Sequence, residues 1–134
     1  MGRLLGLDYG TRRIGVAISD ASQRVATPYA VIEAAEPFPA LDEILATEQI
    51  ETIIVGLPTS LAGHEGPAAA AARAFGKEVA EHTGCEVVFV DERFTTKLAE
   101  DALIAGGVRR AKRRDIRDKM AATVMLQGHL DSLR

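Results

Sequence analysis

The strongest constraint on the fold is a change of hydrophobic pattern early in the chain. Three short apolar segments come first, at residues 3–9, 14–19 and 24–27, and links of turn length join them. Such short links favour antiparallel neighbours. After Pro28, helical and extended patterns alternate, which is typical of parallel strands connected by helices. The two patterns together predict an α/β fold in which an antiparallel meander continues into parallel strands.

The alternating part of the chain predicts two more strands and four helices. The strands are expected at 52–56 and 86–90, and the helices at 39–48, 67–82, 95–105 and from about 113 almost to the C-terminus. Pro67 suits the first turn of a helix, and Gly84 suits a helix end. We therefore expect a five-stranded mixed sheet with helices on both faces, formed as a single domain by residues 1–134.

Composition limits the classes of protein to consider. The chain has 134 residues, of which 47% are hydrophobic, and this is enough for one buried core. Its single cysteine, Cys85, cannot form an internal disulfide, and no cluster of Cys and His is spaced for zinc. No apolar run is long enough to cross a membrane, and the N-terminus lacks the pattern of a signal peptide. We therefore expect a cytoplasmic protein with no membrane partner.

Basic residues are concentrated in one segment, although the chain as a whole is acidic. The net charge is −3, but residues 109–119 hold seven basic and two acidic side chains, a net of +5, which leaves −8 for the rest. A local basic patch is the expected footprint of a nucleic-acid partner. A solvated basic helix start without any partner is the alternative interpretation.

Several carboxylates stand at the ends of predicted elements. Asp8 interrupts an apolar strand, where an acid is costly unless it is paired, hydrogen-bonded or metal-bound. Asp91 and Glu92 follow a buried strand directly, at the end that lines the ligand crevice of open α/β sheets. Asp118 lies near the start of the last helix, beside small residues (Ala121, Ala122) that would let this helix pack closely on the sheet. We therefore expect Asp8, Glu92 and Asp118 to converge.

The predicted acidic cluster needs a counter-charge, because converging carboxylates are otherwise driven toward protonation. Mg²⁺ or Mn²⁺ suits such a site, since both ions prefer oxygen ligands and keep waters that exchange with substrate. Two such ions about 4 Å apart can activate a water and stabilise the departing oxygen of a phosphodiester. The pattern therefore predicts a metal-dependent phosphodiester hydrolase whose basic segment holds the flanking phosphates.

Each acid also has a simpler interpretation when it is considered alone. Asp8 could be a turn acid before Gly10, and Glu92 could start a helix or pair with Arg93. Asp118 could pair with Arg114 or Arg117, since oppositely charged residues three or four positions apart in a helix often do so.

Four motifs, in order along the chain, resemble the YqgF/RuvX family. They are GLDYGTRRIGVA at 6–17, GLP at 56–58 followed by Gly63 and by EGP at 65–67, DERFTT at 91–96, and DKMAA at 118–122. The resemblance runs from residue 4 to about 132. One motif alone would not be specific, but four in register are. Residues 59–62, after the Gly-Leu-Pro motif, are less typical of the family.

The resemblance implies an RNase H-like fold related to the RuvC Holliday-junction resolvases. Members are described as pre-16S rRNA nucleases that mature the 5′ end of 16S rRNA, and resolvase-like action on branched DNA is assigned to some. The family's catalytic acidic positions correspond to Asp8, Glu92 and Asp118. The partners implied are pre-16S rRNA, ribosomal precursors and branched DNA.

Basic residues around these motifs are candidates for nucleic-acid contacts. They are Arg12, Arg13, Arg93, Arg109, Arg110, Lys112, Arg113, Arg114 and Arg117. For Arg12 and Arg13, a pair exposed to solvent is an equally good interpretation. Gly10 and Gly15 are either turn glycines or points where the backbone approaches a phosphate.

Three other functions compete with ribosomal RNA processing. A structure-specific DNase that resolves four-way junctions would use the same acids and metals, and symmetric cleavage would require a homodimer. The first motif also resembles the phosphate loop of actin-like and sugar-kinase ATPases, but those proteins clasp a nucleotide between two such domains. A non-catalytic RNA-binding module would keep the acids without cutting.

Overall fold

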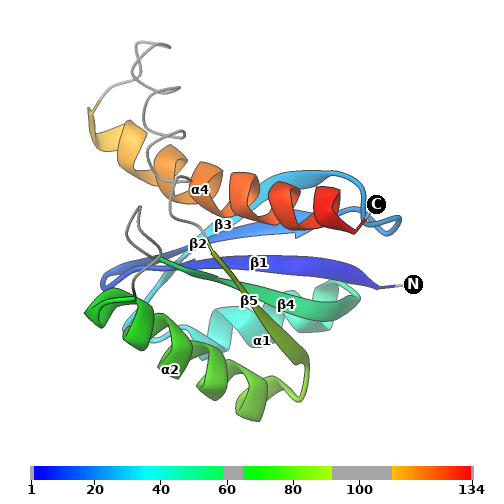
Figure 1. Ribbon diagram of the computed structural model, residues 1–134, viewed down its shortest axis with the longest axis horizontal. Coiled ribbons are helices and arrows are strands. Elements are labelled where there is room, and N and C mark those ends of the chain that lie inside the picture. Colours follow the sequence, from blue (N-terminus) through cyan, green and yellow to red (C-terminus); the bar gives the residue numbers. More distant parts are fainter. Residues whose placement is uncertain (1, 59–64, 92–109, 134) are drawn as a thin grey trace.

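The chain forms one mixed β-sheet with helices on both faces (Figure 1). The structure is a computed structural model that describes residues 2–58, 65–91 and 110–133, apart from the side chains of 110–116. The strands are β1 (Arg3–Tyr9), β2 (Arg13–Ser19), β3 (Ala26–Glu33), β4 (Ile50–Leu57) and β5 (Glu86–Asp91). The helices are α1 (Phe38–Thr47), α2 (Pro67–Thr83) and α4 (Arg110–Ser132). None of these helices is long and apolar enough to cross a membrane.

The sheet order is β3-β2-β1-β4-β5, which confirms the predicted five-stranded mixed sheet. β1 pairs antiparallel with β2, and β2 pairs antiparallel with β3. β4 pairs parallel with both β1 and β5. The predicted meander and the predicted parallel strands therefore join at β1, the central strand.

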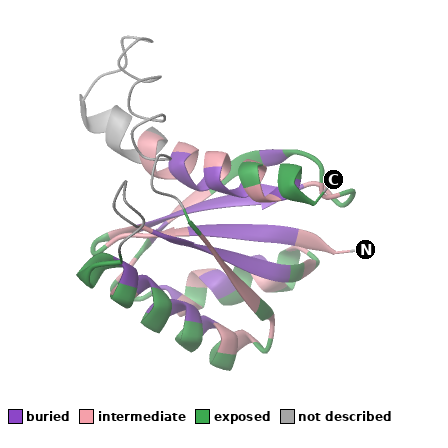
Figure 2. Cartoon of the chain, in the orientation of Figure 1, coloured by how far each residue is buried: buried purple, intermediate pink, exposed green. Residues whose placement is uncertain are grey.

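Alternation along the strands sends successive side chains to two separate cores. Leu5 and Leu7 of β1 belong to the core beneath α1 and α2, whereas Leu4 belongs to the core beneath α4. Figure 2 shows the buried residues running along the central strands and along the sheet-facing sides of the helices. Because β1 is covered on both faces, its central residues, Leu4 to Leu7, are all buried, as expected of an internal strand.

Two predicted elements differ from the structure. The third strand was expected to end before Pro28, but β3 continues through it to Glu33. Pro28 is tolerated because β3 is an edge strand and because the ladder shifts register where Ala17 of β2 pairs with Pro28. The last helix begins slightly earlier than expected, at Arg110. The helix predicted at 95–105 lies outside the described residues.

The backbone of α4 lies unusually close to β1 and β2. A Cβ atom at Gly15 would overlap the carbonyl oxygen of Asp118, and one at Gly6 would lie 3.1 Å from the Leu126 Cβ. Ala121 and Ala122 of α4 are both buried. Small residues on both surfaces therefore allow this approach, as expected from the alanines of the last helix.

Replacing Gly15 by alanine tests this contact. The added methyl group has no room beside Asp118, so α4 or β2 must move. We expect the free energy of unfolding, measured by urea denaturation, to fall by at least about 1–3 kcal/mol, the usual cost of overpacking.

Gly128→Ala is the matched control, because Gly128 lies on α4 and no described atom would come within 4 Å of its Cβ. This substitution should raise stability by about 0.5–1 kcal/mol, since glycine weakens a helix interior. A similar effect of both substitutions would contradict the close contact at Gly15.

Candidate active site

Asp8 is the penultimate residue of β1, and its side chain belongs to the face covered by α4. Leu4 and Gly6 both contact α4, so the two-residue period of the strand places Asp8 on the same side. Tyr9, the next residue, belongs to the opposite face, where its ring stacks on Phe75. Asp8 is only partly buried, which leaves the carboxylate within reach of a ligand at the end of the strand.

Asp118 comes to the same place from the other end of the chain. Asp8 pairs with Gly15 in the β1–β2 ladder, and directly paired residues have Cα atoms about 4.5–5.5 Å apart. The backbone of Asp118 rests on Gly15, on the same face of the sheet. The backbones of Asp8 and Asp118 therefore lie near the same glycine, whereas the convergence of their carboxylates with Glu92 remains a prediction.

Arg13 pairs with Asp118 inside this site. The Arg13 Nε lies 2.9 Å from the Asp118 Oδ2, and this oxygen is shielded from solvent. The side chains are only 27% and 21% exposed, so solvent screens the pair less than it would at the surface. The guanidinium of Arg13 therefore places positive charge beside Asp118, and the predicted contact of Arg13 with nucleic acid stays a prediction.

The other predicted site residues, Glu92 of the metal site and the remaining nucleic-acid contacts, fall into three groups. Glu92, Arg93 and Arg109 lie outside the described residues. Arg110, Lys112, Arg113 and Arg114 belong to the first turns of α4, but their side chains are not described. Arg12 is exposed in the β1–β2 turn, where its carbonyl oxygen accepts a hydrogen bond from the Ala34 N–H at 2.9 Å, and Arg117 is half-buried on α4.

A second ion pair lies near the carboxyl end of β5, and no sequence pattern indicates it. Arg73 of α2 donates to both carboxylate oxygens of Glu65, at 2.8 and 2.6 Å, and its guanidinium lies 5.4 Å from the centre of the Phe89 ring. These hydrogen bonds lower the pKa of Glu65, while the charge of Asp91 acts in the opposite direction. The pair ties Glu65 to α2, and the Arg73 guanidinium lies over Phe89 of β5; the spacing of eight residues gives no sequence signal for it.

The donor set fits a hard divalent cation by its chemistry. Carboxylate oxygens from Asp8 and Asp118 are the ligand type that Mg²⁺ and Mn²⁺ prefer. Within residues 2–58, 65–91 and 110–133, no group of three or more His, Cys, Asp or Glu side chains is placed to hold a metal. The third predicted ligand, Glu92, lies outside this part of the chain, so the complete three-acid set remains a prediction.

A double-mutant cycle of Arg13→Gln and Asp118→Asn measures the ion pair apart from the other contacts of each residue. The 2.9 Å separation and partial burial predict a coupling energy of about 1 kcal/mol in urea denaturation without metal. The matched control is the pair Arg3–Glu48, at 3.9 Å and more exposed, for which Arg3→Gln and Glu48→Gln should couple by less than about 0.3 kcal/mol. Equal coupling energies in both cycles would show that the shorter distance and partial burial do not strengthen the Arg13–Asp118 pair.

The comparisons with known proteins agree with this geometry. The model of the RuvX family, described as Holliday junction resolvase, matches residues 2–132. A protein of Acidiphilium cryptum (strain JF-5) named "Putative pre-16S rRNA nuclease" is 43% identical, over 98% of this chain and 85% of the relative. One of the same name from Lactococcus lactis subsp. lactis (strain IL1403) is 42% identical, over 97% of this chain and 94% of the relative.

A solved structure supports the fold independently of close sequence identity. T. thermophilus RuvC, in complex with a Holliday junction substrate, superposes with a TM-score of 0.57 at 16% identity, over 99% of this chain and 96% of that one. This similarity shows the RNase H-like fold, as the resemblance implied. The motifs, the sheet order and the family match lead to one conclusion: the chain belongs to the RuvX family.

Proposed function

We propose that this protein is a divalent-metal-dependent nuclease that cuts pre-16S rRNA during ribosome biogenesis. Membership of a nuclease family supports the hydrolysis of phosphodiester bonds. The name shared by the relatives supports the RNA substrate. Such a substrate would place the protein where ribosomal precursors are assembled, with residues 1–134 acting as one catalytic unit.

The observation that carries the proposal is the meeting of Asp8 and Asp118 around Gly15. The two acids are far apart in sequence, and they share one face of the sheet only because α4 lies directly on β2. Two carboxylates held together in a partly buried site favour a cation between them.

Glu92 is our proposed third ligand. Val88 and Val90 of β5 pack against the core beneath α4, so the even-numbered positions of this strand share the face that holds Asp8. Asp91 is exposed and belongs to the opposite alternation, which makes it the weaker candidate. β5 and β1 both pair parallel with β4, so their carboxyl ends lie at the same edge of the sheet.

In the proposed mechanism, Asp8, Glu92 and Asp118 would hold the metal. The metal, when bound, would activate a water and stabilise the leaving oxygen of the phosphodiester. Arg13 would orient Asp118 through their ion pair and offset part of the negative charge of the site. The basic side chains of residues 109–117 would hold the flanking phosphates, so that the scissile bond stays above the acids for in-line attack. Cleavage leaves a 5′-phosphate and a 3′-hydroxyl.

Four-way DNA junctions are the second candidate substrate. The description of the matched family favours it, because it names Holliday junction resolvase. Symmetric cutting of a junction needs two active sites related by a two-fold axis. A homodimer in solution is therefore expected for this substrate but not for single cuts in rRNA.

Asp8→Asn tests the metal-dependent mechanism, because it keeps the size of the side chain and removes its charge. On labelled pre-16S rRNA fragments with Mn²⁺ or Mg²⁺, we expect cleavage to fall by at least about a hundredfold, the order of a lost catalytic group. EDTA should abolish the wild-type activity. Asp42→Asn, on α1 across the sheet, is the matched control and should cleave normally.

The same proteins on a synthetic four-way junction and on a linear duplex of equal length distinguish the two substrates. Cutting of the junction alone would replace RNA as the substrate. If the wild-type and Asp8→Asn proteins leave every substrate equally intact, the proposed nuclease activity is contradicted.

The double variant Arg113→Ala and Arg114→Ala tests the proposed phosphate grip. Each lost phosphate contact should reduce the slope of log affinity against log salt by about 0.7–0.9, and the metal affinity should be unchanged. Lys77→Ala, which removes one exposed cation from α2 on the other face, is the control and should leave the slope intact. Lost turnover at saturating substrate with an unchanged slope would contradict this assignment.

A further inference from the structure

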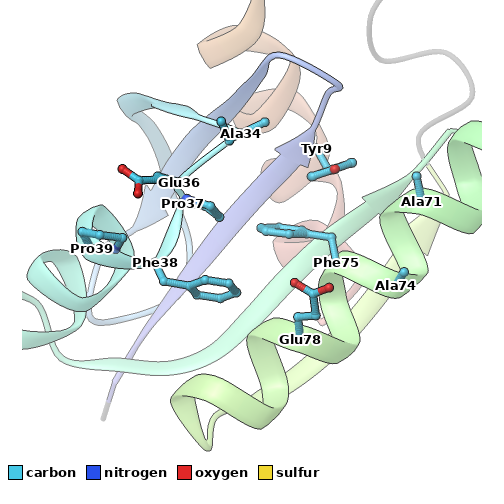
Figure 3. Close-up of a pocket in the computed structure, with 11 residues that line it drawn as sticks. Tyr9, Ala34, Glu36, Pro37, Phe38, Pro39, Ala71, Ala74, Phe75 and Glu78 are labelled. Atoms are coloured by element: carbon cyan, nitrogen blue, oxygen red, sulfur yellow. The ribbon is translucent and has the colours of Figure 1, made fainter.

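A cavity lies on the face of the sheet opposite Asp8. It has a volume of about 490 Å³ and is enclosed by the end of β1, the segment leading into α1, and α2 (Figure 3). Tyr9 lines it, because the alternation that sends Asp8 toward α4 sends Tyr9 the other way. The cavity is therefore separate from the proposed nuclease site, although adjacent residues of one strand serve both.

Aromatic rings form much of the cavity wall. Tyr9 stacks on Phe75 with ring centres 4.6 Å apart, and Phe38 packs against His82 with ring centres 4.4 Å apart. In Figure 3, Tyr9, Phe38 and Phe75 come from three different elements and surround the same space. The uncovered faces of such rings carry partial negative charge, which attracts cations, whereas the faces turned toward each other within these pairs are already occupied.

The charged side chains that line the cavity are both acidic. Glu36 lies on the α1 side and Glu78 on the α2 side, and both residues are exposed. Among the described lining residues there is no Lys or Arg. The chain outside residues 109–119 carries a net charge of −8, so the wider surface adds to the negative potential.

The cavity is poorly suited to a phosphate or a nucleic acid. Helix N-termini bind phosphate through free backbone N–H groups, but Pro37 and Pro39 at the start of α1 have none. The two glutamates would repel an anion. The charge and the aromatic wall are therefore complementary to a cation with an apolar stem.

We propose that this cavity binds an arginine side chain from a basic segment of a partner protein. The planar guanidinium can stack on a ring while it donates hydrogen bonds to a carboxylate, and its methylene stem covers apolar surface. Arginine is also among the residues that most often anchor protein interfaces. The proposal does not depend on the nuclease function, because none of the acids assigned to that function lines the cavity.

The test is a titration of the full-length protein with a capped Gly-Arg-Gly-Arg-Gly peptide, followed by two-dimensional NMR of the backbone amides. The matched probe replaces both arginines by citrulline, which keeps the shape and removes the charge. We expect the arginine peptide to shift amide signals in residues 34–39 and 71–78, and the citrulline peptide to bind at least about fivefold more weakly.

Two variants and one control assign the binding to the cavity. Glu78→Gln, at an exposed position, should weaken peptide binding about fivefold, and Phe38→Leu, which keeps an apolar side chain but removes the ring, about two- to fivefold. Glu86→Gln removes an exposed carboxylate at the start of β5, away from the cavity, and should have no effect. Circular dichroism establishes that each variant is folded.

Several outcomes would overturn the proposal. Equal binding of the arginine and citrulline peptides would show a non-specific apolar pocket. Shifts confined to other surfaces, or no shifts at millimolar peptide, would show that the cavity does not select cations. Self-association in sedimentation velocity that Glu78→Gln abolishes would show that a second copy of this chain occupies the cavity instead.

Discussion

The close contact between α4 and β2 at Gly15 is the constraint on which the proposed site depends. Any side chain at this position would meet the backbone of Asp118, so glycine sets the distance between helix and sheet. That distance decides whether Asp118 reaches the neighbourhood of Asp8. The buried alanines on α4 serve the same end, because larger side chains would lift the helix away from the strands. The packing of small residues is therefore a precondition for Asp8 and Asp118 to lie near each other.

The central strand β1 divides the molecule into two chemically different faces. Asp8 contributes to the face beneath α4, the helix whose first turns carry the basic segment. Tyr9 contributes to the opposite face, where aromatic rings and glutamates surround a cavity. Because the strand period is two residues, adjacent residues of β1 serve two separate surfaces of the molecule. A partner on one face therefore need not compete with nucleic acid on the other.

The architecture could be predicted from the sequence because it follows from local patterns. Short links predicted the meander, and Pro67 and Gly84 marked the ends of α2, where Gly84 adopts a positive φ of 73°. The extent of β3 could not be predicted, because a proline normally ends a strand and only the edge position and the register shift excuse it. The Arg13–Asp118 and Glu65–Arg73 pairs were also missed as ion pairs, since contacts between distant segments leave no periodic signal. The role of Gly15 could not be predicted either, because the sequence suits an ordinary turn glycine and does not show that α4 packs against this position.

Arg13 explains how an acidic site can be tolerated before any cation binds. Two carboxylates drawn together in a partly buried place would raise each other's affinity for protons and weaken the contact of α4 with the sheet. A guanidinium 2.9 Å from Asp118 offsets this repulsion from within the same strand that carries Gly15. β2 therefore has two roles: Gly15 allows α4 to lie close, and Arg13 supplies the positive charge that offsets the repulsion between the two acids. Loss of Arg13 would therefore affect the packing of α4 as well as any contact with phosphate.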